Sequence, residues 1–217
     1  MTRTTGLLME GYRRMHAHFG HRHWWPGETP FEVMVGAILP QNTNWTNVEK
    51  AIANLTRDGL LSARVLYALS PAQLALLIRP AGFFRLKTMR LRAFLAFFIE
   101  EYAGDAARMA DAATDSLREK LLAVKGIGPE TADSILLYAL SKPVFVIDAY
   151  TNRILNRHRL CTEDATYEEL QEFFMDSLPH DVALFNDYHA QIVEVGKKFC
   201  KRAAPQCEGC PLNGWNW

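Results

Sequence analysis

Residues 121–151 constrain the fold of this chain more than any other stretch. They read LLAVKGIGPETADSILLYALSKPVFVIDAYT. An apolar helix end leads into KGIG at positions 125–128. Pro129 then opens a second helix, because proline suits a first turn, where its missing N–H is not needed. The two glycines let the backbone turn sharply, so the sequence predicts two helices joined by a tight hairpin.

The backbone N–H groups of this hairpin are expected at a helix N-terminus, where the helix dipole favours an anion. A nucleic-acid phosphate suits such a site, and its binding there would not depend on the base sequence. The predicted phosphate-binding residues are Lys125, Gly126, Ile127 and Gly128.

Asp148 follows the apolar run VFVI at positions 144–147 and precedes a helix expected over residues 149–158. Two interpretations stay open at this point. The carboxylate could simply cap the helix. Alternatively, a partly buried carboxylate near a bound phosphodiester could take part in a reaction.

The hairpin LLAVKGIGPETA, followed at this distance by VIDAYT, resembles the helix-hairpin-helix DNA glycosylases of the endonuclease III superfamily. Within it, the chain is most similar to the endonuclease III-type 3-methyladenine DNA glycosylases, from about Trp24 to Cys210. The resemblance implies a monomeric base-excision-repair enzyme that hydrolyses the N-glycosidic bond of alkylated purines in double-stranded DNA, with the damaged base flipped out.

The expected fold is all-α and two-lobed, with a DNA-binding cleft between the lobes. Residues 30–140 would form one lobe, and residues 1–29 plus 141–217 the other. Apolar residues recur at helical spacing along the chain, and no convincing strand is present. The motif Ser116-x-x-Glu119 predicts a capping box for the first hairpin helix.

By resemblance, Asp148 is the catalytic residue. Breaking the C1′–N bond builds positive charge on the sugar, which a nearby carboxylate stabilises while orienting an attacking water. Bifunctional family members carry a lysine two positions after the second glycine, where this chain has Glu130. A carboxylate cannot form a Schiff base, so the prediction is a monofunctional glycosylase.

The resemblance also assigns the base pocket and the wedge. Gln41 is expected to fill the gap left by the flipped nucleotide, which offsets part of the unstacking cost of a few kcal/mol. A cationic alkylated base is attracted to aromatic faces, and Glu130 could add a negative charge. The predicted pocket residues are Trp24, Trp25, Pro26, Trp45, Glu130 and Lys197, although Lys197 could equally be a surface lysine and Glu130 an ordinary helix-start acid.

Three cysteines, Cys200, Cys207 and Cys210, have the spacing of the 4Fe–4S cluster of the endonuclease III family. The fourth cysteine of that pattern is replaced by Asn216. A cubane needs four ligands, so Cys161 or a non-cysteine group would complete the site. Zinc and the absence of any metal stay open as alternatives. The chemistry itself needs no metal.

The net charge is zero, which is unusual for a nucleic-acid-binding protein. Local basic clusters could still bind phosphates, and one lies at Arg79, Arg85, Lys87, Arg90 and Arg92. The sequence has neither an apolar run of membrane-spanning length nor a signal peptide, which predicts a cytoplasmic protein. Two other functions stay open: an endonuclease III-like glycosylase for oxidised pyrimidines or mismatches, and a non-catalytic DNA-binding protein.

Overall fold

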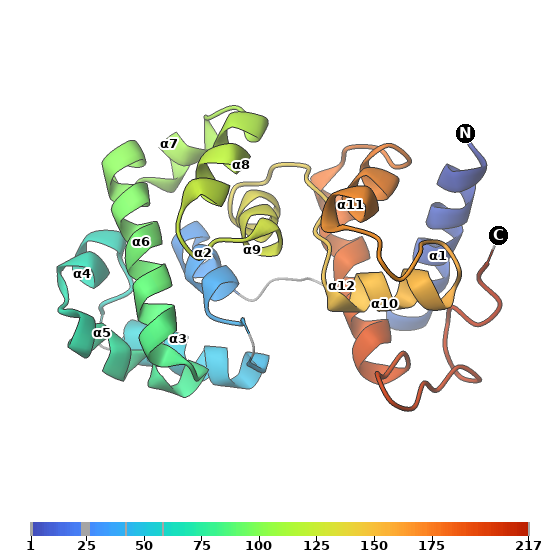
Figure 1. Ribbon diagram of the computed structural model, residues 1–217, viewed down its shortest axis with the longest axis horizontal. Coiled ribbons are helices and arrows are strands. Elements are labelled where there is room, and N and C mark those ends of the chain that lie inside the picture. Colours follow the sequence, from blue (N-terminus) through green and yellow to red (C-terminus); the bar gives the residue numbers. More distant parts are fainter. Residues whose placement is uncertain (1, 23–26, 42, 58, 217) are drawn as a thin grey trace. The chain divides into compact units, whose positions relative to one another are not determined.

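The computed structural model describes residues 2–22, 27–41, 43–57 and 59–216 (Figure 1). In this part of the chain the secondary structure is entirely helical, which confirms the all-α prediction. The helices are α1 (Arg3–Phe19), α2 (Pro30–Ile38), α3 (Trp45–Arg57), α4 (Ala63–Ala68), α5 (Pro71–Leu77), η1 (Arg79–Ala81), α6 (Phe84–Tyr102), α7 (Ala106–Ala110), α8 (Thr114–Ala123), α9 (Pro129–Ser134), η2 (Ile135–Ala139), α10 (Ala149–Arg157), α11 (Tyr167–Met175) and α12 (Val182–Lys198).

The chain divides into two compact units. The continuous unit is Trp25–Lys142, and the discontinuous unit joins Met1–Trp24 to Pro143–Trp217. Both chain termini lie in the discontinuous unit (Figure 1). None of the helices in the described ranges has the length and apolar character needed to cross a membrane.

The core of the continuous unit forms around α2 and α6. The apolar sequence of α2 buries every residue from Val33 to Ile38, because helices cover it on several sides. α2 packs against α6, α9 and η2, and α6 also contacts α4, α5 and α7 (Figure 1). Phe98 links the two central helices, since its ring stacks on Phe31 at 5.9 Å and on Phe94 at 5.7 Å.

The hairpin helices α8 and α9 are fixed to each other by a buried ion pair. Arg118 of α8 donates to both carboxylate oxygens of Asp133 in α9, at 2.7 and 3.0 Å. Asp133 is fully buried, and a bidentate guanidinium–carboxylate pair has a defined geometry. This pair therefore sets how the two helices enter and leave the turn.

The discontinuous unit is built on α12, which packs against α1 and α10. An aromatic cluster fills its core: Phe145 stacks on Phe174 at 4.0 Å and meets Tyr188 of α12 edge-on at 5.7 Å. The segment containing Phe145 precedes Asp148, so this cluster anchors the backbone leading to the predicted catalytic carboxylate.

The helix boundaries differ from the sequence prediction in one informative place. α8 begins at Thr114, with Ala113 at the N-cap and no side-chain cap. The predicted capping box at Ser116 and Glu119 is therefore wrong, because both residues lie inside the helix. Capping boxes with the expected geometry occur instead at Ser70 and Thr166.

Candidate functional site

The hairpin between α8 and α9 depends on Gly126. Its φ is 93°, a backbone conformation that glycine adopts without strain. A Cβ at this position would lie 2.4 Å from the Cγ atom of Arg90, so the glycine also lets α6 approach the turn. Arg90 therefore lies against the hairpin and brings a positive charge to the predicted phosphate site.

The four predicted hairpin residues have different roles in the turn. Ile127 is buried and its N–H donates to the carbonyl of Val124 at 3.0 Å, so this residue anchors the turn inward. Lys125 and Gly128 are exposed. Gly128 is the N-cap of α9. The dipole of a helix favours an anion at this end, so the phosphate site stays a prediction here.

Gln41, the predicted wedge, is held on the hairpin. Its Nε2 atom donates to Oγ1 of Thr131 at 3.1 Å and to the carbonyl of Gly126 at 3.5 Å. The connection between α2 and α3 therefore lies beside the turn, and the role of Gln41 as a wedge stays a prediction.

Lys87, near the start of α6, links the end of α2 to η1. Its ammonium group donates to the carbonyl of Leu39 at 2.8 Å and to that of Ala81 at 2.6 Å. The side chain is 1% exposed, and burial followed by the charge of Arg90 lowers its pKa. Lys87 is therefore a buried residue with a structural role. Its prediction as a surface charge of the basic cluster is wrong.

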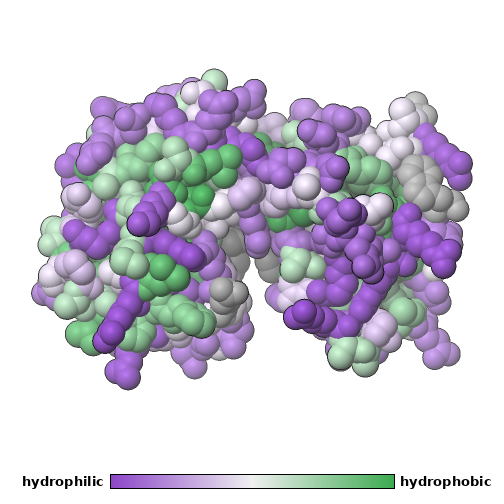
Figure 2. Space-filling view, viewed as in Figure 1, coloured by the Kyte–Doolittle hydropathy of each residue, from purple (hydrophilic) through white to green (hydrophobic). Residues whose placement is uncertain are grey.

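Phe83 is exposed where η1 turns into α6, and it is not among the residues predicted from the sequence. The side chain is 67% exposed, and its φ of 43° is unusual for a residue with a side chain. Strained, exposed residues of this kind often mark functional positions. Apolar side chains also gather nearby over α5 and the first turns of α6 (Figure 2), where Leu76, Leu86 and Met89 are exposed. We call Gln41, Arg90 and residues 125–128 the hairpin surface.

Asp148, in the discontinuous unit, caps α10 with one carboxylate oxygen. Its Oδ1 atom accepts bonds from the N–H of Thr151 at 2.7 Å and from the hydroxyl of Thr151 at 2.9 Å. The capping interpretation of the sequence is thus confirmed. It leaves the second oxygen, Oδ2, for another partner.

That partner is His189 of α12. Its Nε2 atom lies 3.6 Å from Oδ2 of Asp148, and the two side chains are 7% and 10% exposed. Burial alone would raise the pKa of Asp148, but the imidazole of His189 and the two Thr151 bonds outweigh it and hold the pKa below its ordinary value. Asp148 is therefore ionised at neutral pH although it is almost enclosed.

His189 could not be assigned from local sequence. It lies on the buried face of α12 with Phe185 and Ile192, where a histidine usually only packs in the core. Its contact with Asp148 arises only because α10 and α12 pack side by side.

The remaining predicted pocket residues lie on different helices or outside the described residues. Trp24, Trp25 and Pro26 lie outside the described residues. Trp45 is half-buried at the start of α3, and Glu130 is exposed in the first turn of α9. Lys197 is exposed in the last turn of α12, on the same helix as His189. The cleft between the lobes, and the proximity of Asp148 to the hairpin surface, remain predictions.

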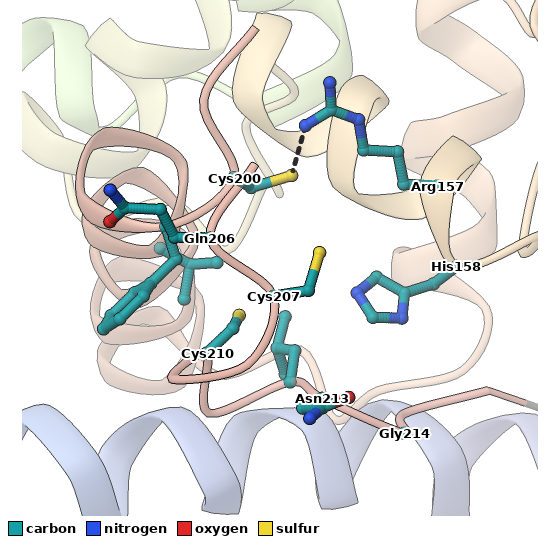
Figure 3. A pocket seen from close by; sticks show the side chains of 11 residues that line it. Arg157, His158, Cys200, Gln206, Cys207, Cys210, Asn213 and Gly214 are labelled. Atoms are coloured by element: carbon teal, nitrogen blue, oxygen red, sulfur yellow. Dashed lines mark hydrogen bonds between the residues drawn. The ribbon is translucent and has the colours of Figure 1, made fainter. Parts of the chain in front are cut away.

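The three C-terminal cysteines line one cavity of about 150 Å³ in the discontinuous unit (Figure 3). Arg157 and His158, at the end of α10, line the same cavity, and Nη1 of Arg157 donates to Sγ of Cys200 at 3.2 Å. Burial raises the pKa of the Cys210 thiol, and the neighbouring Cys200 and Cys207 add to this effect.

Three thiols and one imidazole line this cavity, and both are donor types found in iron–sulfur sites. Among the described residues, no three His, Cys, Asp or Glu side chains are grouped closely enough to hold one ion. Cys161, one of the two completions considered from the sequence, is not among the residues lining the cavity.

Comparisons with known proteins show the family of this chain. The HhH-GPD superfamily of base excision DNA repair proteins matches residues 35–180. A Methanocaldococcus jannaschii protein, provisionally named a DNA repair glycosylase, is 47% identical over 95% of this chain and 94% of its own length. Endonuclease III of Thermotoga maritima is 32% identical over 84% of this chain and 80% of its own.

Two solved structures have the same fold. The Helicobacter pylori 3-methyladenine DNA glycosylase bound to 1,N6-ethenoadenine has a TM-score of 0.77 at 27% identity, covering 91% of this chain and 98% of that one. An endonuclease III–DNA complex has a TM-score of 0.83 at 22% identity, covering 100% and 95%. The chain therefore belongs to the HhH-GPD superfamily and is a DNA glycosylase of the endonuclease III type.

Proposed function

We propose that this glycosylase removes alkylated purines such as 3-methyladenine from double-stranded DNA, and that Asp148 is its catalytic carboxylate. The observation that carries the proposal is the state of Asp148. Its carboxylate is enclosed, oriented by Thr151 and kept ionised beside His189. A carboxylate in this state is suited to a reaction that develops positive charge.

In the proposed mechanism, the Oδ2 side of Asp148 faces the sugar of the flipped nucleotide. As the C1′–N bond breaks, the carboxylate stabilises the positive charge on the sugar, orients the water that attacks C1′ and accepts the proton that this water loses. An alkylated purine is already cationic, so it leaves as a neutral base and needs little help from an acid. His189 acts as a positioning residue, because it fixes the second oxygen and disfavours protonation of Asp148.

The hairpin surface would hold the DNA strand. The first turn of α9 and Arg90 supply N–H groups and positive charge for phosphates. Gln41 and the exposed ring of Phe83 are the side chains that would enter the stack when the base leaves it.

The preference for alkylated purines is supported by the predicted aromatic pocket around Trp24, Trp25, Pro26 and Trp45, with Glu130 and Lys197 as polar contributors. It is also supported by likeness to the H. pylori 3-methyladenine DNA glycosylase. A cationic base gains roughly 0.5–2 kcal/mol from each good aromatic contact. The competing proposal is a glycosylase for oxidised pyrimidines, which identity to the T. maritima endonuclease III favours.

The substrate is tested with duplexes carrying 3-methyladenine, 7-methylguanine, hypoxanthine, thymine glycol or uracil, by measuring base release under single-turnover conditions. We expect release of the methylated purines. Preferential release of thymine glycol would establish the competing proposal instead. A wild-type protein that releases none of these bases would contradict the function as a whole.

The catalytic role is tested with Asp148→Asn. Asparagine caps a helix as well as aspartate does, so the fold should be preserved while the charge is lost. We expect base release to fall by about 10²- to 10⁴-fold with duplex binding retained. The matched control is Asp176→Asn, which removes an exposed carboxylate at the end of α11 and should leave the rate unchanged.

The enzyme is proposed to be monofunctional, because Glu130 occupies the position of the lysine found in bifunctional members. Borohydride should therefore trap no covalent adduct during turnover on a damaged duplex. An adduct that forms as fast as the base is released would refute this part of the proposal.

We also propose that Cys200, Cys207 and Cys210 hold a 4Fe–4S cluster. The group would hold the C-terminal loop together after α12 and supply no atom to the reaction at C1′. Anaerobically purified protein should contain iron and absorb visible light, and protein lacking both would exclude the cluster without affecting the glycosylase proposal.

A further inference from the structure

We infer that His158 is the fourth ligand of the metal group bound by the three cysteines, in place of the absent fourth cysteine. The inference rests on the proposed cluster and is independent of the proposed reaction at Asp148. It explains how this chain could keep a four-ligand site although position 216 is asparagine.

The position of the imidazole supports this assignment. His158 ends α10 and lines the cavity together with Cys200, Cys207 and Cys210. Figure 3 shows its ring directed toward Cys207, on the side of the cavity opposite Gln206. No other histidine lines this cavity among the described residues.

The hydrogen bonding of His158 leaves the correct nitrogen for a metal. Its Nδ1 atom is bonded to the backbone carbonyl of Trp215. A carbonyl only accepts, so Nδ1 carries the proton and the neutral ring presents the lone pair of Nε2. Metal-binding histidines are typically oriented in this way, by a carbonyl or carboxylate on the other nitrogen.

The carbonyl that orients His158 is itself firmly held. The indole of Trp215 donates to the carbonyl of Leu7 at 2.9 Å and packs against Gly11 of α1, where a Cβ would lie 2.7 Å from the ring. The side chain of the next residue, Asn216, is exposed. The C-terminal segment that would supply a fourth cysteine in the family thus fixes the histidine instead.

The remaining contacts of α10 support a preorganised thiolate site. Arg157 donates to Sγ of Cys200 and to the carbonyls of Lys201 and Arg202, at 2.8 and 2.9 Å for the two carbonyls. Arg153 donates to the carbonyl of Cys200 at 2.8 Å. Hydrogen bonds of this kind orient metal ligands and stabilise their charge.

Histidine is an established ligand of iron–sulfur clusters and raises their reduction potential relative to all-cysteine ligation. The test therefore compares wild type, His158→Cys and His158→Ala after anaerobic purification. We measure iron and zinc per chain, the visible spectrum, the midpoint potential, and nitrogen couplings in the electron paramagnetic resonance spectrum of the reduced protein.

We expect wild type to contain about four iron atoms per chain and to show coupling to a directly bound nitrogen. His158→Cys should keep the iron, lose the nitrogen coupling and have a more negative potential. His158→Ala should lose one iron or the whole cluster. Cys161→Ser and His180→Ala are matched controls outside the cavity and should behave as wild type.

His158→Cys keeps the inference testable even if the alanine variant does not fold. Iron content, potential and nitrogen coupling that are unchanged in both variants would refute the ligand and leave the cluster intact. Wild type without iron, or with zinc in its place, would refute the cluster and the ligand together. In either case base release by wild type, measured in parallel, decides the glycosylase proposal separately.

Discussion

At the scale of single residues, the contact between His189 and Asp148 should control the pH dependence of the reaction. Asp148 has a lowered pKa in the fold, so its stabilising contribution is present above its unfolded pKa of about 3.9 and is lost as the pH falls through the lower folded value. Removing His189 removes two of the causes that lower this pKa.

We therefore expect His189→Gln to move the acid limb of the single-turnover rate to higher pH, together with a lower plateau rate and little change in duplex affinity. His180→Gln, which alters an exposed histidine in the same unit, is the control. A variant with a lower rate but an unmoved acid limb would show that His189 serves only packing.

Substitutions at the two hairpin glycines should differ in their effect on the free energy of unfolding. Gly126→Ala introduces a side chain at φ 93° and 2.4 Å from Arg90, so we expect a loss of about 1–3 kcal/mol in unfolding free energy. Gly128 has φ −99° and no neighbour within 4 Å of an added Cβ. Gly128→Ala should therefore stay within about 0.5 kcal/mol of wild type. Chemical denaturation of the two variants tests this difference, and equal losses would contradict it.

At the scale of elements, Lys87 joins the end of α2 to η1 and so supports the segments that lead to Gln41 and to Phe83. Lys87→Met would leave the carbonyls of Leu39 and Ala81 without this donor in a buried position. The expected cost is about 1–3 kcal/mol, because an unsatisfied buried polar group loses its solvation without compensation.

Thermal unfolding would measure this cost, and a duplex titration would show weaker binding as Gln41 and Phe83 lose their support. Arg85→Met is the matched control, since Arg85 is an exposed cation on the same helix. Equal effects of the two substitutions would show that Lys87 acts through its charge rather than as a strut.

At the scale of the whole molecule, a protein with zero net charge is proposed to bind a polyanion. Binding should still weaken steeply with salt, because each phosphate contact releases counterions regardless of the average charge. Arg90→Ala should reduce the salt slope of duplex binding by about 1, as expected for one lost phosphate contact. Arg108→Ala, which removes an exposed arginine 3.7 Å from Asp105, should leave the slope unchanged.

The sequence by itself determined the features that depend on neighbouring residues. The glycine hairpin, the helical periodicity and the capping position of Asp148 were all readable locally, because turns, helix faces and caps are set within a few residues. The resemblance carried by these motifs was enough to predict the family and the all-α fold.

Only the tertiary structure decided which distant side chains meet. In the folded protein His189 lies beside Asp148, and His158 lines the cysteine cavity. Lys87 is buried although its basic neighbours in the sequence are surface residues, and Phe83 is exposed. The physical reason is that burial and partners arise from helix packing. A charge, an aromatic ring or an imidazole has the same local signature whether it ends in solvent, in the core or beside a reactive group.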